Sequence, residues 1–88
     1  MLIAVYTNSF KKDLKRVKKR GKNLNKLKDI IAKIVNEEPL PAKNKEHKLI
    51  GNYKDRWECH IESDWLLVYK VTSKEGIFVG TGTHSDLF

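Results

Sequence analysis

The sequence has few of the residues that crosslink a chain or carry it into a membrane. Its 88 residues include a single cysteine, which excludes an internal disulfide and a zinc site built from cysteine pairs. This scarcity is typical of a reducing compartment, so we expect a cytoplasmic protein. No apolar run approaches the roughly 20 residues that a membrane-spanning helix needs, so we expect no membrane association.

The sequence also lacks features that would mark a boundary between two domains. Glycine and proline account for only 5 and 2 residues, and we find no repeat or linker. The apolar start at residues 1–6 is too short for a signal-peptide core, and charged residues follow it instead of preceding it. Because 40% of the 88 residues are apolar and recur in patterned segments, disorder is disfavoured. We expect one domain over residues 1–88.

Acidic residues are scarce in the first half of the chain. Residues 1–48 hold 14 of the 18 Lys and Arg but only 5 acidic residues, whereas residues 49–88 hold 4 basic and 6 acidic residues. The formal charges of the two halves are therefore +9 and −2. This asymmetry favours a polyanionic partner such as nucleic acid or the ribosome, although a lysine-rich helix face is often only a solvated surface.

Two amphipathic helices are predicted in this cationic half. Over residues 9–20 the apolar residues recur at spacings of four and three, and Gly21 follows as a stop signal. A second apolar stripe follows the candidate cap Asn23 and ends before two prolines. The short connection between the two stripes predicts an antiparallel helical hairpin.

Strands are predicted around this hairpin. β-Branched or alternating segments lie at residues 2–6, 49–51, 57–62 and 65–71, and a last strand begins at 77–79. The resulting order is β-α-α-β-β-β, with one further short strand left open. It predicts an α+β fold in which the helical hairpin packs on one face of an antiparallel sheet.

A two-residue turn at Ser63-Asp64 is expected to set the register of the central strands. In that register Glu62 pairs with Trp65, and the face that carries His60 also carries Trp65. Strand alternation places Glu58 and Glu62 on the same face as His60.

The three histidines are candidates for acid–base chemistry. His47, His60 and His84 lie in a loop, a strand and a strand end, and the sequence leaves open whether they converge. Imidazole exchanges protons near neutral pH because its ordinary pKa is ~6.5. RNA cleavage by a 2′-OH needs a base for the hydroxyl, an acid for the 5′-oxygen and cations for the phosphorane, and the chain has residues for each part. The alternative is that each histidine is a surface or hydrogen-bonded residue.

Neighbouring residues carry similar alternatives. Asp64 either orients a histidine, binds a base edge or serves only as a turn residue. Trp65 either stacks on a nucleobase or belongs to the core. Phe88 is an aromatic last residue with little to bury against unless the tail docks, so we expect residues 85–88 to fold back onto the domain.

Metal and cysteine chemistry are disfavoured. No His-x-x-x-His or Cys-x-x-Cys spacing is present, and Cys59 and His60 point to opposite faces of a strand. Cys59 falls on the expected core face, where a thiol without a cationic neighbour is inert. We expect no metal and no other cofactor.

The segments that carry the histidines resemble a known toxin family. Residues 46–51, 59–70 and 81–88, in this order, are similar to the YafQ branch of the RelE/ParE toxin superfamily. The resemblance covers nearly the whole chain and implies a RelE-like fold. It implies the toxin of a type II toxin–antitoxin pair, an mRNA interferase that cuts mRNA in the ribosomal A site and inhibits translation. The implied partners are a cognate antitoxin, the ribosome and mRNA, and operator DNA for the toxin–antitoxin complex is left open.

The resemblance also implies roles for individual residues. The implied acid–base set is His47, His60, Asp64 and His84, with Trp65 and Phe88 supporting the substrate. His84 is the expected general acid for the 5′-oxygen. His60 and Asp64 are then expected on the 2′-OH side, with His47 assisting or contacting phosphate.

Two positions depart from the pattern of this branch. Gly80 stands where an arginine often precedes the Thr-Gly-Thr-His motif, and Arg56-Trp57 reverses an aromatic–arginine order. We expect Arg56, Lys54 or a ribosomal group to stabilise the phosphorane instead. Gly80 and Gly82 are expected to allow close approach of another backbone or of a ligand.

The strongest alternative is a ParE-like toxin or another basic binding protein without nuclease activity. A third reading is a regulatory nucleic-acid-binding module. The presence of His60, Asp64 and His84 counts against the first of these alternatives, and the second stays open. The first helix offers contacts to the ribosome or the antitoxin through Lys11, Lys15, Lys18 and Lys19.

Overall fold

The computed structural model describes residues 1–49 and 55–88. In chain order the elements are β1 (Ile3–Tyr6), α1 (Asn8–Lys19), α2 (Leu24–Val35), the 3₁₀ turn η1 (Ala42–Asn44), β2 (His47–Lys48), β3 (Trp57–Glu62), β4 (Trp65–Val71), β5 (Glu75–Gly82) and α3 (His84–Leu87). The strand predicted at residues 49–51 and the turn after it fall mainly on residues 50–54, outside the described residues. The described strand nearest to it, β2, ends at Lys48.

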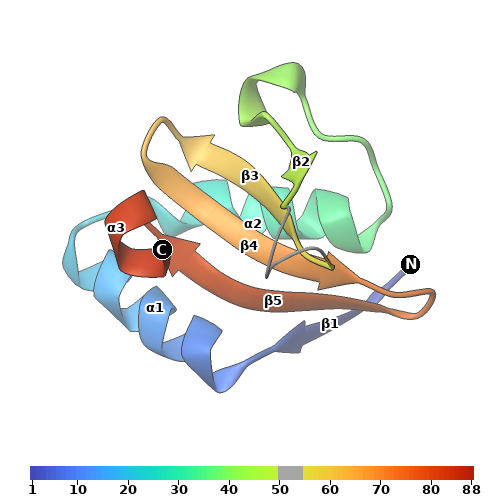
Figure 1. Ribbon diagram of the computed structural model, residues 1–88, viewed down its shortest axis with the longest axis horizontal. Helices are drawn as coiled ribbons and strands as arrows, with labels where there is room; N and C mark the ends of the chain where they lie inside the picture. The colour runs from blue at the N-terminus through green and yellow to red at the C-terminus, as the bar shows by residue number, and fades with distance from the viewer. Residues whose placement is uncertain (50–54) are drawn as a thin grey trace.

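The described strands form a mixed sheet in the order β1-β5-β4-β3-β2 (Figure 1). Strands β2 to β5 pair antiparallel, as predicted, but β1 runs parallel to β5, with Val5 opposite Ile77. Parallel neighbours need a long crossover connection, and the helical hairpin begins that connection after β1. The α+β class is confirmed, and the prediction of an entirely antiparallel sheet was wrong in this one pairing.

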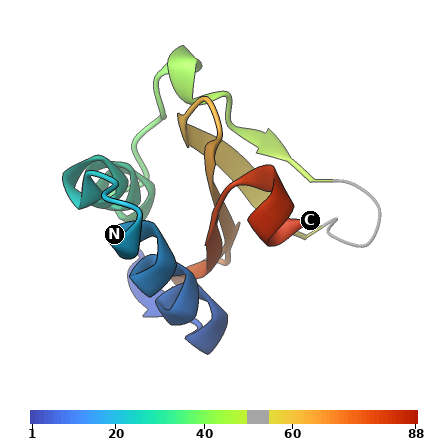
Figure 2. The same cartoon turned by 90° about the vertical axis from the view of Figure 1, so that its left-hand side faces the viewer.

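The helical hairpin is confirmed: α1 begins and ends one residue before the predicted bounds, and α2 begins directly after the predicted cap Asn23 but ends at Val35, well before Pro39. The Thr7 hydroxyl caps α1 by accepting a hydrogen bond of 3.0 Å from the backbone of Phe10, and the Asn23 side chain caps α2 in the same way at 3.0 Å from Asn25. Gly21 follows α1 with a φ of 78°. Figure 2 shows α1 and α2 on one side of the sheet and α3 on the other.

The main core lies between the sheet and the hairpin. Its buried members are Phe10, Val17, Leu27, Ile30, Ile34, Cys59, Trp65, Leu67, Tyr69 and Phe78. Burying one large apolar side chain contributes about 1.5–3 kcal/mol, so this layer supplies most of the stabilisation of the fold. Leu66 and Val68 are also buried, on the opposite face of β4.

A β-bulge in β3 changes which side chains share a face. Glu62 pairs with Trp65 as predicted, but His60 pairs with Leu66, so Ile61 is an extra residue between them. The bulge reverses the alternation, because a shift of one residue moves every following side chain to the other face. Trp65 therefore faces the helices, and the prediction that it shares a face with His60 was wrong.

Glu62 is turned toward the helices by the same bulge. Its carboxylate oxygens lie 3.0 Å from the Lys22 ammonium and 2.9 Å from the Lys26 ammonium. The Lys26 hydrogen bond, followed by that of Lys22, lowers the pKa of Glu62. Glu62 thus ties the β3–β4 hairpin to the start of α2 and is not part of the His60 face.

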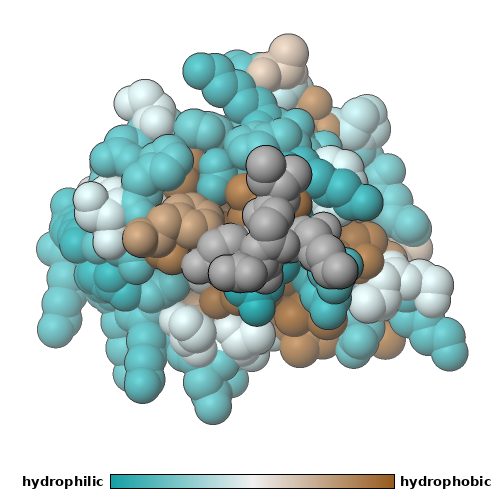
Figure 3. All heavy atoms as spheres, in the orientation of Figure 1, coloured by the Kyte–Doolittle hydropathy of each residue, from teal (hydrophilic) through white to brown (hydrophobic). Residues whose placement is uncertain are grey.

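The surface matches the charge pattern of the sequence. Hydrophilic side chains project from the region of α1 in Figure 3. Lys11, Lys15, Lys18 and Lys19 are all exposed there. Among the described residues, no helix has the length and apolar character needed to cross a membrane.

Candidate active site

Three histidines from distant segments converge at one end of the sheet. His47 lies on β2, His60 on β3 and His84 at the start of α3. The ring centres of His47 and His60 are 6.4 Å apart, and those of His60 and His84 are 6.2 Å apart. The middle ring is the most enclosed, with 18% of the His60 side chain exposed. We refer to these three residues as the histidine row.

Asp64 joins the histidine row at its His84 end. Asp64 stands in the turn between β3 and β4, and its Oδ1 atom lies 3.5 Å from Nδ1 of His84. The same oxygen accepts a hydrogen bond of 3.3 Å from the backbone N–H of His84. The sequence had grouped Asp64 with His60, but its contact is with His84.

A buried carboxylate that the sequence did not single out lies at the other end of the row. Glu58 precedes His60 by two residues on β3, and its side chain is 5% exposed. Its Oε1 atom lies 3.4 Å from Nε2 of His47 and 3.8 Å from Nε2 of His60. Strand alternation placed Glu58 on the His60 face, but nothing in the sequence signalled its burial.

Backbone carbonyls fix the other nitrogens of these two rings. Nδ1 of His47 lies 2.8 Å from the carbonyl oxygen of Lys45, and Nδ1 of His60 lies 3.3 Å from that of Ser63. A carbonyl oxygen can only accept a hydrogen bond, so each Nδ1 carries a proton. The Nε2 atoms are therefore the ones available for proton exchange.

Asp86 holds the short helix α3 in place. Its carboxylate accepts a hydrogen bond of 2.9 Å from the backbone N–H of Thr83, and the Thr83 hydroxyl accepts one of 3.2 Å in return, which forms a capping box. The Arg20 guanidinium donates to both carboxylate oxygens, at 2.5 and 3.1 Å, and Arg16 adds an ion pair at 3.0 Å. The Arg20 hydrogen bonds are the largest cause that lowers the pKa of Asp86.

Two glycines of β5 make this docking possible. A Cβ atom at Gly82, whose φ is 153°, would lie 2.7 Å from the Asp86 carboxylate. A Cβ atom at Gly80 would lie 2.9 Å from Oδ2 of Asp13 and 3.2 Å from the Leu87 side chain. The prediction was close approach of another backbone or of a ligand, whereas the atoms that lie closest to both glycines are side-chain atoms of Asp13, Leu87 and Asp86. A larger residue at position 80 would displace Asp13 or Leu87.

Trp65 supports the site from beneath and does not face a substrate. It is 1% exposed, and its Nε1–H donates a hydrogen bond of 2.9 Å to the Thr81 hydroxyl. Thr81 in turn donates from its hydroxyl to the Leu66 carbonyl at 2.7 Å and from its backbone N–H to buried Asp13 at 3.1 Å. The suggested stacking of Trp65 on a nucleobase is therefore wrong, since the core encloses the indole.

The remaining predicted residues are dispersed around the row. Phe88 is 52% exposed, and its ring centre lies 6.2 Å from that of His84. Figure 3 shows apolar atoms at the surface where the C terminus lies in Figure 1. Arg56 lines a cavity of about 370 Å³ together with Phe88 and Asp86. Lys54 lies outside the described residues.

Cys59 takes no part in the site. Its side chain is completely buried, as predicted for the core face of β3. Burial, together with the nearby charges of Glu46 and Glu58, raises the pKa of the thiol to about 12. A thiol in this state is not a nucleophile at neutral pH.

No ready-made metal cluster accompanies the histidine row. Within residues 1–49 and 55–88, no group of three or more His, Cys, Asp and Glu side chains is arranged to hold a metal ion.

The chain matches a family model over almost its full length. The model, described as "Bacterial toxin of type II toxin-antitoxin system, YafQ", covers residues 2–88. This match assigns the chain to the class of small bacterial toxins that are paired with an antitoxin. Within this class, the chain belongs to the YafQ family.

Individual relatives agree with this assignment. The mRNA interferase toxin YafQ of Escherichia coli K12 is 44% identical over 84 residues, which span 94% of this chain and 91% of the relative. The toxin in the crystal structure of the E. coli DinJ-YafQ toxin-antitoxin complex is 42% identical, with a TM-score of 0.92 over 99% of this chain and 97% of that one. A copper-bound mutant toxin from Helicobacter pylori is 36% identical, with a TM-score of 0.96 and complete coverage of both chains. These similarities confirm the predicted RelE-like α+β fold.

Proposed function

We propose that this toxin is an endoribonuclease that cuts mRNA on the ribosome and thereby inhibits translation. The observation that carries the proposal is the convergence of the histidine row with two separate carboxylates, Glu58 and Asp64, at opposite ends. The printed activity of the 44% identical relative, an mRNA interferase, supports the same class of reaction.

The spacing of the row suits attack by a 2′-OH on the adjacent phosphate. A general acid or base must come within about 3 Å of the oxygen that it serves. The ring centres of His60 and His84 lie 6.2 Å apart, close enough for both imidazoles to contact oxygens of one phosphate bound across the row. One ring then serves the attacking oxygen and the other serves the leaving oxygen.

His60 is the proposed general base. Its Nε2 takes the proton of the 2′-OH, and the resulting oxygen attacks phosphorus. His47 and Glu58 assist from the same side, because the Glu58 carboxylate lies 3.4 Å from the His47 ring and 3.8 Å from the His60 ring. A carboxylate in this position stabilises the imidazolium that forms when a ring accepts the proton.

His84 is the proposed general acid. As the bond from phosphorus to the 5′-oxygen breaks, Nε2 of His84 gives its proton to that oxygen. The products are a 2′,3′-cyclic phosphate and a free 5′-OH. Asp64 orients the ring through its contact with Nδ1 at 3.5 Å. We thus move Asp64 from the base side, where the sequence had placed it, to the acid side.

Cations and an aromatic ring complete the proposal. Arg56 opens on the same cavity as Phe88 and is the described candidate for offsetting charge on the phosphorane. Phe88 is exposed beside His84 and offers a surface for stacking one base. Lys54 keeps its predicted role as a second cation.

The proposed reaction uses no metal ion, since base, acid and orienting carboxylates are all side chains. If copper or another metal binds, as it does in the mutant toxin from H. pylori, we expect it to occupy imidazole nitrogens and so to inhibit cleavage. Cleavage that persists in a chelator such as EDTA is the expected result. Cleavage that stops in EDTA and returns with a metal would contradict this part.

A cognate antitoxin is the proposed protein partner. The toxin of the E. coli DinJ-YafQ complex covers this chain almost completely at 42% identity, which supports a similar pairing here. Binding of the toxin–antitoxin complex to operator DNA stays a prediction, as does the cytoplasmic location.

The activity is tested by primer extension on an mRNA under translation, with purified protein added. We expect discrete cuts with the wild type and none without ribosomes. His60→Ala and His84→Ala should remove the cuts, whereas Cys59→Ser should leave their positions unchanged. Cuts that persist in both histidine variants would contradict the catalytic assignment of His60 and His84. Growth arrest by a wild type that makes no cuts would favour the alternative, a ParE-like or basic binding protein without nuclease activity.

A further inference from the structure

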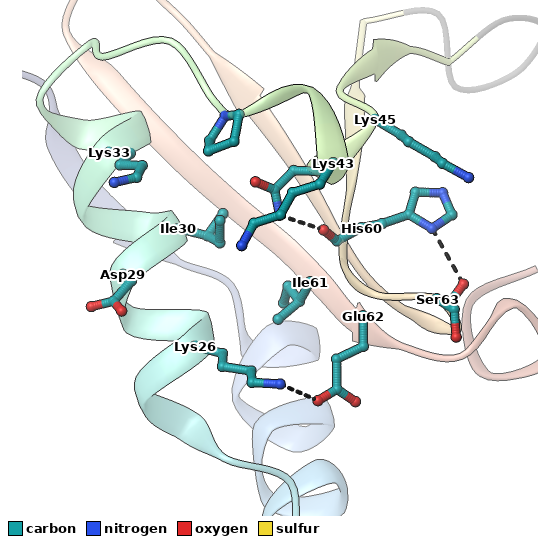
Figure 4. A pocket seen from close by; sticks show the side chains of 12 residues that line it. Lys26, Asp29, Ile30, Lys33, Lys43, Lys45, His60, Ile61, Glu62 and Ser63 are labelled. Atoms are coloured by element: carbon teal, nitrogen blue, oxygen red, sulfur yellow. Dashed lines mark hydrogen bonds and ion pairs between the residues drawn. The ribbon is translucent and has the colours of Figure 1, made fainter.

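A groove that adjoins the histidine row at His60 runs between α2 and the segment from η1 to β3. Its volume is about 540 Å³. Ile30 from α2, Pro41 and Ile61 form apolar parts of its lining. Figure 4 shows Ile30 and Ile61 at its centre, with lysine side chains around them. The bulge in β3 matters here, because Ile61 is the extra residue that it inserts.

Four lysines line this groove from two directions. Lys26 and Lys33 come from α2, whereas Lys43 and Lys45 come from η1 and its C-terminal cap. The acidic residues of the lining are Asp29 and Glu62, and Glu62 is paired with Lys26 at 2.9 Å. Within the described residues no ion pair engages Lys33, Lys43 or Lys45. The groove therefore keeps an excess of positive charge over an apolar floor.

The wall of the groove opposite α2 is fastened to β3 and is shared with the histidine row. Buried Asn44 donates a hydrogen bond of 2.8 Å from its side chain to the carbonyl of His60, which fastens η1 to β3. Lys45 follows with a φ of 47°, a left-handed conformation that a lysine adopts at a cost of roughly 1 kcal/mol. Its carbonyl fixes the ring of His47 at 2.8 Å. One short turn thus positions lysines of the groove and a histidine of the site.

The groove also opens directly onto the site. His60 and Ser63 belong to its lining, and Figure 4 shows Lys45 extending beside the His60 ring. A polyanion bound at His60 would therefore meet this groove within a short distance. An apolar floor with cations on its rim suits single-stranded RNA, whose sugars and bases pack on the floor while its phosphates meet the lysines.

We propose that this groove binds the segment of the substrate mRNA that flanks the cleaved phosphate on the His60 side. The inference rests on the proposed function, because it assigns a path to the same substrate. Lys33 and Lys43 contact its phosphates, and Ile30 and Ile61 contact its sugar and base. Ribosomal RNA and an acidic segment of the antitoxin are the competing occupants.

A double-mutant cycle between protein and RNA separates these occupants. The protein variant is Lys33→Gln combined with Lys43→Gln. The RNA variants are synthetic mRNAs on purified ribosomes, each with one uncharged methylphosphonate linkage, placed in turn at the first to fourth linkage on each side of the cut. 2′-Deoxy sugars protect the modified linkages, and the cleaved linkage stays natural. Lys74→Gln, at an exposed position in the turn at the other end of β5 from His84, is the control.

On natural mRNA the double variant should raise KM about tenfold, with kcat within twofold and the cut at the same nucleotide. At one or two linkages on a single side of the cut, methylphosphonate should raise the KM of the wild type and of the control. At the same linkages it should not raise the KM of the double variant above its value on natural mRNA. The proposal would be overturned if the factors by which the protein variant and the RNA variant change KM multiply at every linkage. The lysines would then act on ribosomal RNA, on the antitoxin or on no partner. If the wild type cuts no mRNA while it folds normally, the proposed function itself fails and the groove assignment falls with it.

Discussion

Asp86 and Arg20 lie 66 residues apart in the chain, yet the Arg20 guanidinium donates hydrogen bonds of 2.5 and 3.1 Å to the two oxygens of the Asp86 carboxylate. The pair joins the last turn of α1 to the short helix that carries His84. The sequence predicts that the cationic first helix is a binding surface. Arg20, at the end of this helix, instead stabilises the fold of the chain itself.

Asp86→Asn should loosen α3 and reduce cleavage without unfolding the rest of the protein. Loss of the ion pairs and weakening of the capping box should cost about 1–2 kcal/mol. NMR signals of residues 83–88 should broaden or shift, while those of β3 and β4 stay. Glu38→Gln, at an exposed position after α2, is the matched control and should change neither readout.

The same contact predicts a pH dependence. The Arg20 hydrogen bonds lower the folded-state pKa of Asp86 below the unfolded value of about 3.9. The contribution of this carboxylate to the unfolding free energy is therefore complete above about pH 4 and is lost as the pH falls further. The stability difference between the wild type and Asp86→Asn, measured by urea unfolding, should be constant from pH 7 to about pH 5 and should shrink toward pH 3. A difference that grows in acid would contradict the assignment.

Glu58→Gln should separate activity from stability. The variant keeps the shape of the side chain but removes the charge beside His47 and His60, so we expect the cleavage rate to fall about tenfold or more. The unfolding free energy should not fall, because a largely buried carboxylate near two imidazoles costs desolvation energy. Glu62→Gln is the matched control on the same strand. It breaks the pairs with Lys22 and Lys26, so stability should fall slightly, but the cleavage rate should fall far less than in Glu58→Gln, because Glu62 pairs with lysines and not with the histidine row.

Trp65→Phe and Phe88→Ala should give opposite results. The first removes the hydrogen bond to Thr81 and leaves a gap in the core, which should cost about 1–3 kcal/mol, while the activity of the folded fraction changes less than threefold. The second removes an exposed ring, so stability should hold while mRNA cleavage falls about five- to a hundredfold. Urea unfolding measures the stability of both variants, and cleavage rates at low temperature measure their activity. Equal losses of activity in the two variants would place Trp65 in contact with substrate after all.

The exposed lysines of α1 should act on binding and not on catalysis. Lys15→Glu combined with Lys19→Glu should weaken association with the ribosome or the antitoxin about tenfold or more at physiological salt, with a smaller dependence on salt concentration. Arg16 and Arg20 are left intact because they hold Asp86. Lys70→Glu with Lys74→Glu is the control of equal charge. Association that is equally weak in both pairs would indicate an effect of net charge alone.

The parts of the fold that the sequence predicted are those with a strong local pattern. The stop at Gly21 and the cap Asn23 mark the end of the first helix and the start of the second, because these signals act within one turn of the chain. The turn before Trp65 likewise fixed the pair Glu62–Trp65. The bulge at Ile61 had no such local signature, and this one residue changed the faces assigned to Trp65 and Glu62.

The parts of the site that the sequence missed depend on distant partners. Asp13 reads as one acidic residue in a lysine-rich helix, but it is buried and accepts the backbone N–H of Thr81, 68 residues away. Glu58 reads as the exposed member of an alternating strand, and only the packing of the site covers it. The histidines themselves were found because their chemistry is rare in the chain, although their convergence required the fold.

The central claim is that His84 donates the proton to the 5′-oxygen while His60 acts on the 2′-OH. The most direct measurement compares cleavage of ribosome-bound mRNA carrying either the natural linkage or a bridging 5′-sulfur, which leaves without needing a proton. His84→Ala should be about 10²- to 10⁴-fold slower than the wild type on the natural linkage but within tenfold on the 5′-sulfur linkage, whereas His60→Ala should be slow on both. A His84→Ala variant that is equally impaired on both linkages, or unimpaired on the natural one, would contradict the account.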